Sequence, residues 1–409
     1  MNPFLSDTFI TVWEKHFLKG IKSEYFQFLP EVPFYKSKIP GLYINSGKNL
    51  TKGIQLNFSK TDLNKEKNKC FLVYDVIDYE LDKLDKSVIS QANYAIKQYP
   101  GYLIHLSQFN SLEDYLNKSF KKSSRYKLRK YKKRLEDSFS INFKAYTGVI
   151  NREQYDSIFV SFRKLLEKRF LEKQITNNNL DLEEWNFYFD VVYPLILEEK
   201  AVLFVLYNKD TPISITLGYL SENRIYDAIT VFDIDYTKFH LGSIKIMYLI
   251  DWSIKNNWEM LDFSKGHYEY KTRWANKKFD FYYHLWFDEN SIKATLVAKL
   301  IKAFFKFKQY LRDRNINEKL HRLTYRLKSK NVTINKEFSL EKINLESIDY
   351  KLNEIPMFSL ENNTLKRACF EYLYLYPEKE SNLKIYQIDS EENRFLIKGI
   401  SNHALVTIV

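Results

Sequence analysis

Glycine is scarce in this chain of 409 residues, which contains only ten. No two of these glycines are separated by a single residue. The G-x-G-x-x-G fingerprint and the Walker A loop both need several glycines where the backbone approaches phosphate. Both loops are therefore excluded, and any phosphate site in this protein must rely on a single glycine.

Cysteine and recognisable metal motifs are also scarce. The two cysteines, Cys70 and Cys369, are too few for a disulfide framework and form no C-x-x-C motif, so they indicate a reducing compartment and read as buried small hydrophobes. The seven histidines show neither H-x-x-H nor H-E-x-x-H spacing. We therefore expect no metal site, and in particular no structural or hydrolytic zinc.

Long apolar runs are absent. No stretch approaches 18 apolar residues, and the first ten residues do not have the basic and apolar regions of a signal peptide. The hydrophobic fraction of 45% is that of a globular chain, which excludes disorder as the main state. We expect a cytoplasmic protein that does not span the membrane.

Positive charge is concentrated in two short segments. The formal net charge is +12, of which residues 101–140 carry +6 and residues 291–330 carry +10, so the remaining chain is slightly acidic. Both segments have apolar residues at helical spacing with lysines and arginines on the other faces. They are either the solvated faces of packed helices or binding surfaces for an anionic partner, such as coenzyme A or tRNA phosphates, an acidic acyl carrier protein or an anionic membrane surface.

The first hundred residues mix both kinds of element. We predict a helix around Phe9–Phe17, strands at Pro40–Ile44 and Cys70–Val76, and a helix near Lys86–Gln98. A strand at residues 101–106 leads into the first basic helix, Phe120–Leu135. Two further helices follow, one after Asn151 and one around residues 182–194.

Residues 201–287 have the clearest pattern. Apolar runs at 201–207, 213–220 and 225–231 are separated by short turns, which predicts an antiparallel meander. A helix is predicted at Ser243–Asn256, followed by a short strand at Met260–Phe263, a short helix through 270–274 and a last strand at Phe281–Phe287. The third strand, the helix and the next strand form a crossover of the parallel type.

Gly242 stands directly before the predicted helix. The first amide N–H groups of a helix have no partner within it and lie at the positive end of its dipole, so a pyrophosphate can bind there. Gly242 would allow close approach and the Ser243 hydroxyl would add a donor. The alternative is an ordinary N-cap without a ligand.

The order of these elements is that of the GNAT acyltransferase core, and short motifs extend the likeness. Residues 236–243 (YTKFHLGS), 261–266 (LDFSKG) and 270–274 (YKTRW), together with Asp233 and the arginine-containing helix 120–135, resemble the CelD/BcsL-like branch of the GNAT superfamily. Fem-type transferases, built from tandem GNAT units, are also similar. The resemblance implies an α+β GNAT fold with a mixed central sheet flanked by helices, in tandem GNAT-like halves.

The domains expected on this basis are four. They are an N-terminal GNAT-like half (1–105), a GNAT acyltransferase core (106–290), a basic amphipathic helical segment (291–330) and a small β-rich region (331–409). In the last one we predict strands at Phe370–Tyr376, Leu383–Ile388, Arg394–Ile397 and Leu405–Val409, and no motif there carries chemistry.

The resemblance implies transfer of an acyl group, acetyl or longer, from coenzyme A or an acyl carrier protein to an amine or hydroxyl of a small-molecule, glycan or lipid acceptor. The polysaccharide, lipid or cell-envelope precursor that would accept it is left open. Two alternatives are a Fem-type transferase that draws an aminoacyl group from tRNA, and a non-catalytic module that binds a carrier or lies peripherally on the inner face of the membrane.

Site residues follow from the motifs. Asp262 is the candidate base, with helix capping or an ion pair with Lys265 or Lys271 as its other interpretation. Lys271 would stabilise the oxyanion or grip a phosphate, and Tyr270 or Tyr226 would protonate the leaving thiolate. The expected donor-binding residues are Leu241, Gly242, Ser243, Ile244, Arg125 and Arg129. Arg273 and Trp274 are expected to form a structural stack.

Overall fold

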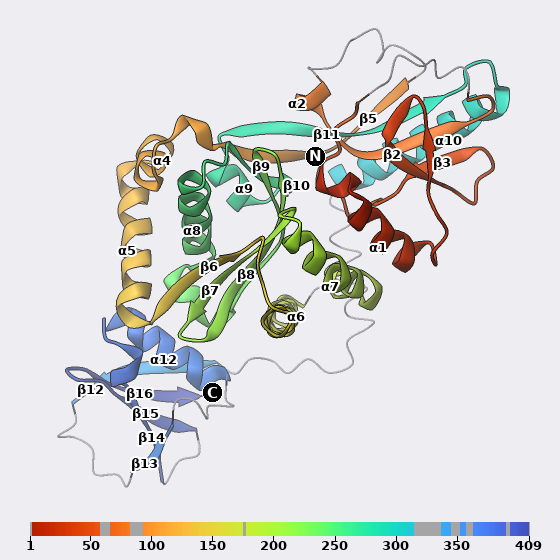
Figure 1. Ribbon diagram of the computed structural model, residues 1–409. Helices are drawn as coiled ribbons and strands as arrows, with labels where there is room; N and C mark the ends of the chain where they lie inside the picture. Colours follow the sequence, from red (N-terminus) through yellow and green to blue (C-terminus); the bar gives the residue numbers. More distant parts are fainter. Residues whose placement is uncertain are drawn as a thin grey trace.

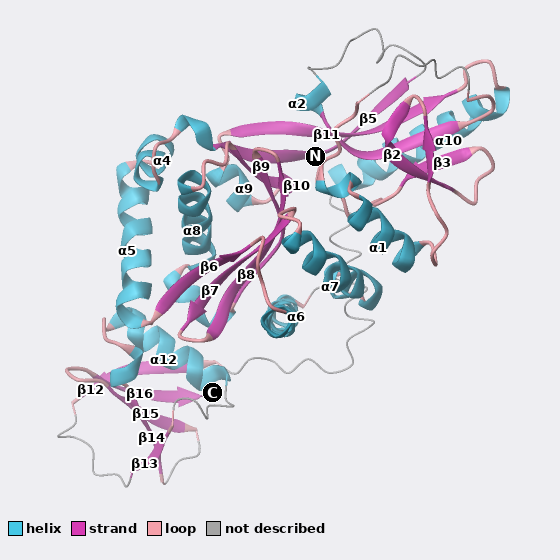
Figure 2. Ribbon diagram, viewed as in Figure 1, coloured by secondary structure: helices cyan, strands magenta, loops and turns pink. Residues whose placement is uncertain are grey.

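The protein has a mixed α+β architecture with two sheets (Figures 1 and 2). The structure, a computed structural model, describes residues 2–57, 66–81, 93–174, 177–314, 337–344, 352–356, 363–389 and 393–408. The α-helices in these ranges are α1 Asp7–Phe17, α2 Asp78–Leu81, α4 Leu112–Ser119, α5 Lys122–Ser138, α6 Arg152–Lys173, α7 Leu182–Leu197, α8 Leu241–Lys255, α9 Glu269–Trp274, α10 Ile292–Asp313 and α12 Asn363–Leu375.

The larger sheet has eleven strands and is mixed. Its order from one edge to the other is β1 Glu24–Phe26, β2 Leu29–Lys36, β3 Leu42–Asn45, β4 Cys70–Ile77, β11 Lys277–Phe287, β5 Asn93–His105, β10 Met260–Lys265, β9 Arg224–Phe232, β8 Thr211–Ser221, β7 Ala201–Asn208 and β6 Ile141–Tyr146. The sheet thus runs without a break from the N-terminal strands into the meander (Figure 1). The long strands β5 and β11 join the two parts, because they pair with each other along most of their length.

The predicted meander is confirmed. Strands β7, β8 and β9 pair antiparallel, and each hairpin has a residue with positive φ at its tip, Lys209 and Glu222. The predicted crossover is also confirmed, since β9 and β10, which precede and follow α8 in the sequence, pair in parallel. This parallel pairing covers only Arg224–Tyr226 against Met260–Asp262, and the last residues of β9 run on beyond it.

Helices cover both faces of the meander. Helices α1, α6 and α7 contribute to one core with the inner residues of β7, β8 and β9. Helices α4, α5 and α8 pack on the other side, together with residues of β5 and β10. The predicted basic helix Phe120–Leu135 is confirmed as α5, which begins two residues later than predicted because the chain is extended at Phe120 and Lys121 between α4 and α5. Helix α10 packs on β3, β4, β5 and β11.

The prediction of a helix at Lys86–Gln98 is wrong for its last six residues, and the earlier part lies outside the described residues. Residues 93–98 belong to β5, which pairs with β11 from Asn93 to Leu103. The strand is favoured because pairing with β11, and with β10 further along, satisfies its backbone groups. These partners lie far away in the sequence, so local spacing could not reveal them.

The C-terminal residues form a small unit of α12 and a five-stranded antiparallel sheet. Its order is β12 Phe338–Ile343, β16 His403–Ile408, β15 Arg394–Lys398, β14 Lys384–Ile388 and β13 Leu352–Ile355. The strands predicted at Leu383–Ile388, Arg394–Ile397 and Leu405–Val409 are confirmed, the last one up to Ile408, since Val409 lies outside the described residues. The strand predicted at Phe370–Tyr376 is wrong, because this segment lies in α12 up to Leu375.

The aromatics of α12 explain that error. Phe370, Tyr372, Tyr374 and Tyr376 alternate as in a strand, but the buried residues Leu365, Ala368, Cys369, Tyr372 and Leu373 follow helical spacing. Burial of this helical face against the small sheet and the core outweighs the local alternation. None of the helices in the described ranges has both the length and the apolar character needed to cross a bilayer.

Candidate functional site

A cavity of about 280 Å³ lies where β9 ends and α8 begins. It is bounded by α6, by the short helix η5 (Ile234–Phe239) and by α9. Its lining residues are Arg169, Thr230, Phe232, Thr237, His240, Leu241, Gly242, Ser243, Lys245, Ile246, Tyr270 and Trp274. The predicted donor site and one predicted catalytic residue, Tyr270, thus face the same space.

The first turn of α8 forms one wall of this cavity. The helix begins at Leu241, two residues earlier than predicted, so Gly242 lies within the first turn. His240 precedes the helix at φ 56° without a capping side chain, and its carbonyl accepts from the N–H groups of Ser243 (2.8 Å) and Ile244 (3.2 Å). Leu241, Gly242 and Ser243 line the cavity, whereas Ile244 is fully buried in the core. An anion in the cavity would therefore face the positive end of the helix dipole.

Gly242 is needed for the packing of this wall. A Cβ atom at position 242 would lie only 2.9 Å from Cε1 of Phe232, whose ring also lines the cavity. Glycine therefore lets the end of β9 and the start of α8 approach each other closely. This is a steric reason for the glycine, beside the phosphate approach that the sequence suggested.

Two cations that the sequence analysis missed lie in the cavity wall. Lys245 of α8 is 5% exposed and donates to the Thr230 hydroxyl, and the Arg169 guanidinium of α6 stacks over the Phe232 ring at 4.4 Å. Burial lowers the pKa of both side chains. Among the described residues neither has a carboxylate within ion-pair distance, so the wall carries positive charge that an anionic ligand could neutralise. No cluster of metal-ligating side chains occurs in the described ranges.

Asp227 is a third residue that the sequence analysis missed. It lies on β9 directly after the last residue paired with β10, where the two parallel strands separate. Its side chain is buried, its Oδ2 has no hydrogen-bond partner among the described residues, and burial raises its pKa. The charges of Lys245, Lys271 and Lys52 act against this shift. Asp227 is thus an unsatisfied carboxylate beside the cavity.

Lys271, on α9, interacts electrostatically with Asp227. Its ammonium donates to the carbonyl oxygens of Lys265 (2.7 Å) and Ser264 (3.2 Å). Burial lowers its pKa to about 8, against the opposing charges of Asp227 and Asp262. The predicted pair of Lys271 and Asp262 therefore does lie in one electrostatic cluster, although neither residue lines the cavity.

Asp262 is fully enclosed on β10. One oxygen accepts from the Ser264 N–H at 2.6 Å and the other from the Tyr79 hydroxyl at 3.2 Å. Burial raises its pKa to about 6, opposed mainly by the charge of Arg224. It makes no ion pair with Lys265, which binds Asp75 instead at 2.6 Å. Both oxygens of Asp262 thus have partners, unlike those of Asp227.

The tyrosines predicted as proton donors differ in position. Tyr270 lines the cavity, its hydroxyl has no hydrogen bond to a described residue, and burial raises its pKa. Tyr226 is fully buried, and its hydroxyl accepts from Arg224 at 2.8 Å. Tyr270 is therefore the one that faces the site. The expected stack of Arg273 on Trp274 is replaced by Arg273 over the Phe120 ring at 5.8 Å.

Arg125 and Arg129 lie away from the cavity, at the corner between α4 and α5. Arg125 donates to the carbonyl oxygens of Asn117 (3.2 Å) and Phe120 (2.8 Å), and Arg129 pairs with Glu113. Their guanidinium groups thus join the two helices. Their predicted role in donor binding gains no support from this geometry.

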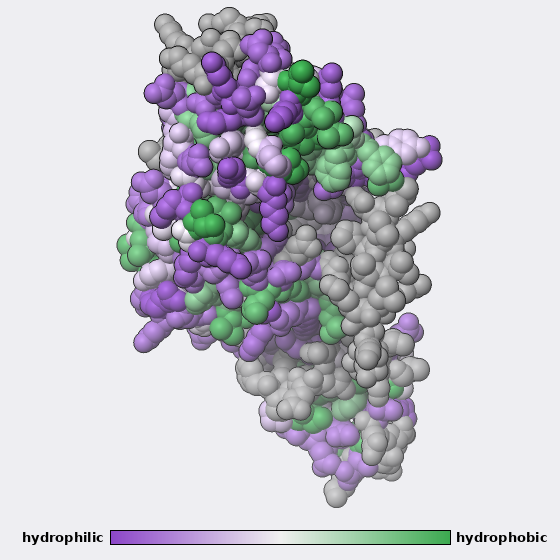
Figure 3. Space-filling view, turned by 90° about the vertical axis from the view of Figure 1, so that its right-hand side faces the viewer, coloured by the Kyte–Doolittle hydropathy of each residue, from purple (hydrophilic) through white to green (hydrophobic). Residues whose placement is uncertain are grey.

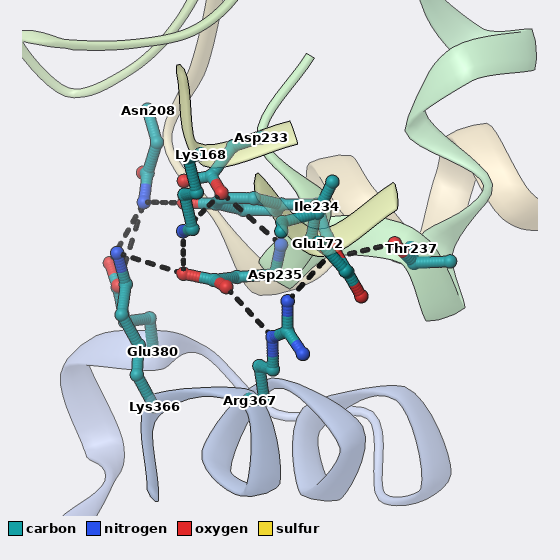
Figure 4. A network of polar contacts seen from close by, with 11 residues as sticks. Lys168, Glu172, Asn208, Asp233, Ile234, Asp235, Thr237, Lys366, Arg367 and Glu380 are labelled. Carbon is teal, nitrogen blue, oxygen red and sulfur yellow. Dashed lines mark hydrogen bonds and ion pairs between the residues drawn. The ribbon is translucent and has the colours of Figure 1, made fainter. Parts of the chain in front are cut away.

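The loop that leads into α8 is anchored by a network of buried carboxylates (Figure 4). Asp235 on η5 accepts from Lys168 of α6 at 2.5 Å and from Arg367 of α12 at 3.2 Å. Lys168 also binds Asp233 at 2.6 Å, and Arg367 binds Glu172 at 3.1 Å. Thr237 and His240 follow Asp235 closely in the sequence and line the cavity. The C-terminal unit, through Arg367, therefore helps to hold the rim of the cavity.

Some of the missed residues left a signal in the sequence. Asp227 is an acid whose nearest neighbours in the strand are apolar or aromatic, and Lys245 follows directly after a buried residue of α8. A charged residue at a buried position of this kind is a candidate for a functional site. Arg169 gave no such signal, because it is one of several cations near the end of α6.

Comparison with known proteins supports the GNAT fold that the order of the elements predicts. A family model described as an acetyltransferase (GNAT) domain matches residues 122–272, which run from α5 to α9. This segment includes every residue that lines the cavity except Trp274. No curated protein matches the chain.

Solved structures with a similar arrangement have low sequence identity to the chain. The C-terminal domain of a lysylphosphatidylglycerol synthetase described as putative, from Agrobacterium fabrum, is 11% identical with a TM-score of 0.43, covering 67% of this chain and 84% of its own. A protein of unknown function from Bacteroides thetaiotaomicron is 10% identical with a TM-score of 0.47, covering 70% and 91%. L-PGS from Bacillus licheniformis is 11% identical with a TM-score of 0.43, covering 72% and 96%. The family match at residues 122–272 and the order of the elements together identify the fold of the protein as a mixed α+β fold of GNAT type.

Proposed function

We propose that the protein is an acyltransferase that takes an acyl group from a thioester of coenzyme A or an acyl carrier protein and passes it to an amine or a hydroxyl. The observation that carries this proposal is the cavity at the start of α8, where a helix N-terminus meets the buried Lys245 and the half-buried Arg169, neither of which has a carboxylate within ion-pair distance among the described residues. That combination suits a phosphate-bearing ligand.

The donor would be held by this chain in two ways. Its phosphates would lie against the first turn of α8, with Lys245 and Arg169 supplying charge. Beyond Tyr226, β9 no longer pairs with β10, so its free edge can accept an extended amide-containing arm as an added strand. The bound donor supplies the activated acyl group.

Asp227 and Tyr270 would handle the protons. Asp227 accepts a proton from the acceptor as its nitrogen or oxygen forms a bond to the acyl carbon, and Tyr270 donates one to the sulfur as the carbon–sulfur bond breaks. Burial raises the pKa of Asp227, and the positive charges of Lys245, Lys271 and Lys52 act against this shift and favour its carboxylate form. Exchange with solvent then returns both residues to their starting state.

Several finer expectations belong to this proposal. The motifs at residues 236–243, 261–266 and 270–274 favour the CelD/BcsL-like branch, with an acceptor from glycan, lipid or cell-envelope precursors. Two buried cysteines without a disulfide fit a cytoplasmic location. An acyl carrier protein is the partner expected if the donor is carrier-bound.

Donor binding is the direct test. Thermal-shift and calorimetric titrations with acetyl-CoA, a long-chain acyl-CoA, an acyl carrier protein and an aminoacyl-tRNA would be compared on the full chain and on Lys245→Met. Saturable binding of a thioester donor that weakens in the variant would support the proposal. Binding of aminoacyl-tRNA alone would favour the Fem-type alternative, and binding of none would favour a non-catalytic module.

A further inference from the structure

Helix α10 has two apolar faces, and only one of them is covered. The inner face consists of Ala294, Ala298, Ile301 and Phe305, which pack against β3, β4, β5 and β11. The other face is exposed, although it is also built from large apolar side chains. A helix that packs on a globular core ordinarily has one apolar stripe and a polar outer face.

The exposed stripe is continuous along the helix. Its members follow one another at intervals of three or four residues and are all between 49% and 87% exposed, namely Ile292, Leu296, Leu300, Phe304, Phe307 and Tyr310. Of the eighteen large hydrophobic side chains that are exposed in the described ranges, six thus lie on this one helix. The others are scattered, which is the ordinary state of a protein surface.

Lysines border the stripe. Lys299, Lys302 and Lys306 lie along one side of it at helical spacing, and Lys308 lies on the other. Between Ile292 and Arg312 the helix contains no acidic residue. Figure 3, which views the side of the molecule where α10 lies, shows hydrophobic and hydrophilic side chains close together on the upper part of this face.

We propose that this outer face of α10 docks on an anionic lipid bilayer, with the helix axis in the plane of the interface. The apolar side chains would enter the region of the headgroups and the first acyl carbons, while the lysines would extend to the lipid phosphates. The charge pattern selects this occupant, because a second copy of the chain would bring the same lysines against each other. The surface is independent of the proposed acyl transfer, since it needs no residue of the cavity.

Vesicle co-sedimentation of the full chain tests the proposal. We expect binding to vesicles of phosphatidylcholine with 30–40% phosphatidylglycerol and little binding to pure phosphatidylcholine, with the bound fraction falling as salt is raised. The variant Leu296→Ser/Leu300→Ser/Phe304→Ser should lower the partition coefficient at least tenfold. Its fold should be unaffected because all three side chains are exposed.

Two matched controls sharpen the test. The first is a triple variant in which Val149, Val160 and Leu171, exposed apolar residues outside α10, are replaced by serine. It should leave vesicle binding unchanged. The second compares two triple glutamine variants. Replacing Lys122, Lys127 and Lys130 on α5, the other basic helix, should lower vesicle binding less than replacing Lys293, Lys299 and Lys306 on α10.

Three results would overturn the proposal. One is equal binding of the wild-type protein to neutral and anionic vesicles, or binding to neither. Another is a dimer that dissociates in the α10 serine variant, measured by light scattering, which would assign the stripe to a second copy. The third is salt-dependent tRNA binding that the α10 glutamine variant loses while vesicle binding is absent. None of these results depends on whether the acyltransferase proposal is correct.

Discussion

The guanidinium group of Arg367 on α12 lies 3.2 Å from the carboxylate of Asp235 on η5. The Asp235 side chain is completely buried, and Lys168 of α6 reaches its other oxygen at 2.5 Å (Figure 4). The C-terminal unit is therefore tied to the segment that leads directly into the first turn of α8. This contact connects a unit that lacks any recognisable chemical motif to the rim of the candidate site.

Replacing Arg367 by alanine should loosen that rim. Lys168 remains to compensate Asp235, so we expect a loss of about 1–2 kcal/mol in the free energy of unfolding, less than for a buried charge left without any partner. Donor affinity should fall as well, because Thr237 and His240 line the cavity. Urea unfolding and calorimetric titration measure the two effects. The control is Lys255→Ala, which breaks the exposed pair with Asp251 and should change stability by less than about 0.5 kcal/mol.

Gly242→Ala tests the close packing of α8 against β9. The new Cβ would meet the Phe232 ring at 2.9 Å, so the ring must move into the cavity, and we expect a loss of about 1–3 kcal/mol in stability together with weaker donor binding. The double variant Gly242→Ala/Phe232→Leu removes the ring and should recover most of that stability relative to Phe232→Leu alone. Independent, additive effects of the two substitutions would show that the ring is not what excludes a side chain at position 242.

Lys245→Met should separate stability from binding. The lysine is buried without an ion pair to a described residue, so an apolar side chain of similar length should leave stability unchanged or raise it. Donor affinity should fall at least tenfold, because a charge facing the phosphates is lost. Lys255→Met on the same helix is the matched control, since Lys255 is exposed and paired with Asp251. Equal affinity of the two variants would remove Lys245 from the donor site.

Much of the fold could be predicted because it is encoded locally. The meander has apolar strands with turn residues between them, and α8 has its apolar residues at helical spacing. The strand at residues 93–98 could not be predicted in the same way, because β5 is selected by pairing with β10 and β11, whose residues lie more than 150 positions later. The wrong prediction of a strand in α12 has a related cause. The segment has apolar residues at both strand and helix spacing, and only the folded core shows which of the two sets is buried.

The sequence predicted those site residues that lie together in a single motif or element. Leu241, Gly242, Ser243 and Tyr270 belong to motifs and do line the cavity. Asp227 was missed because its importance comes from its neighbours. These are Lys52, Lys245 and Lys271, which come from three distant segments and meet only in the folded chain.

Stability should depend on Lys271 between pH 8 and pH 10. Its pKa is about 8 in the folded protein and 10.5 when exposed, so the folded state releases its proton first as the pH rises. The cost of burying the charge is fully present below pH 8 and is removed above it, so this residue makes stability increase with pH in that window. Lys271→Met should lower the slope of the unfolding free energy by up to about 1.4 kcal/mol per pH unit. Urea unfolding at several pH values measures this slope, with Lys255→Met as the control variant. Identical slopes for the wild-type protein and Lys271→Met would contradict the burial of a charged Lys271.

Comparison of Asp227→Asn with Asp262→Asn decides which carboxylate accepts the proton. Asp227 has an oxygen without a described hydrogen-bond partner where the parallel strands separate, whereas both oxygens of Asp262 have donors. We therefore expect Asp227→Asn to lower the turnover rate by a factor of about 10² to 10⁴ with donor affinity nearly unchanged.

Asp262→Asn should act on stability instead. The folded-state pKa of Asp262 is raised to about 6, so the wild-type protein loses stability as the pH rises from about 4 to 6, and the variant should lack that loss. Steady-state rates from pH 5 to 9 and urea unfolding at pH 4 to 7 separate the two roles. If Asp262→Asn abolishes turnover while Asp227→Asn retains it, the proton acceptor is Asp262, and the exposed edge of β9 serves donor binding alone.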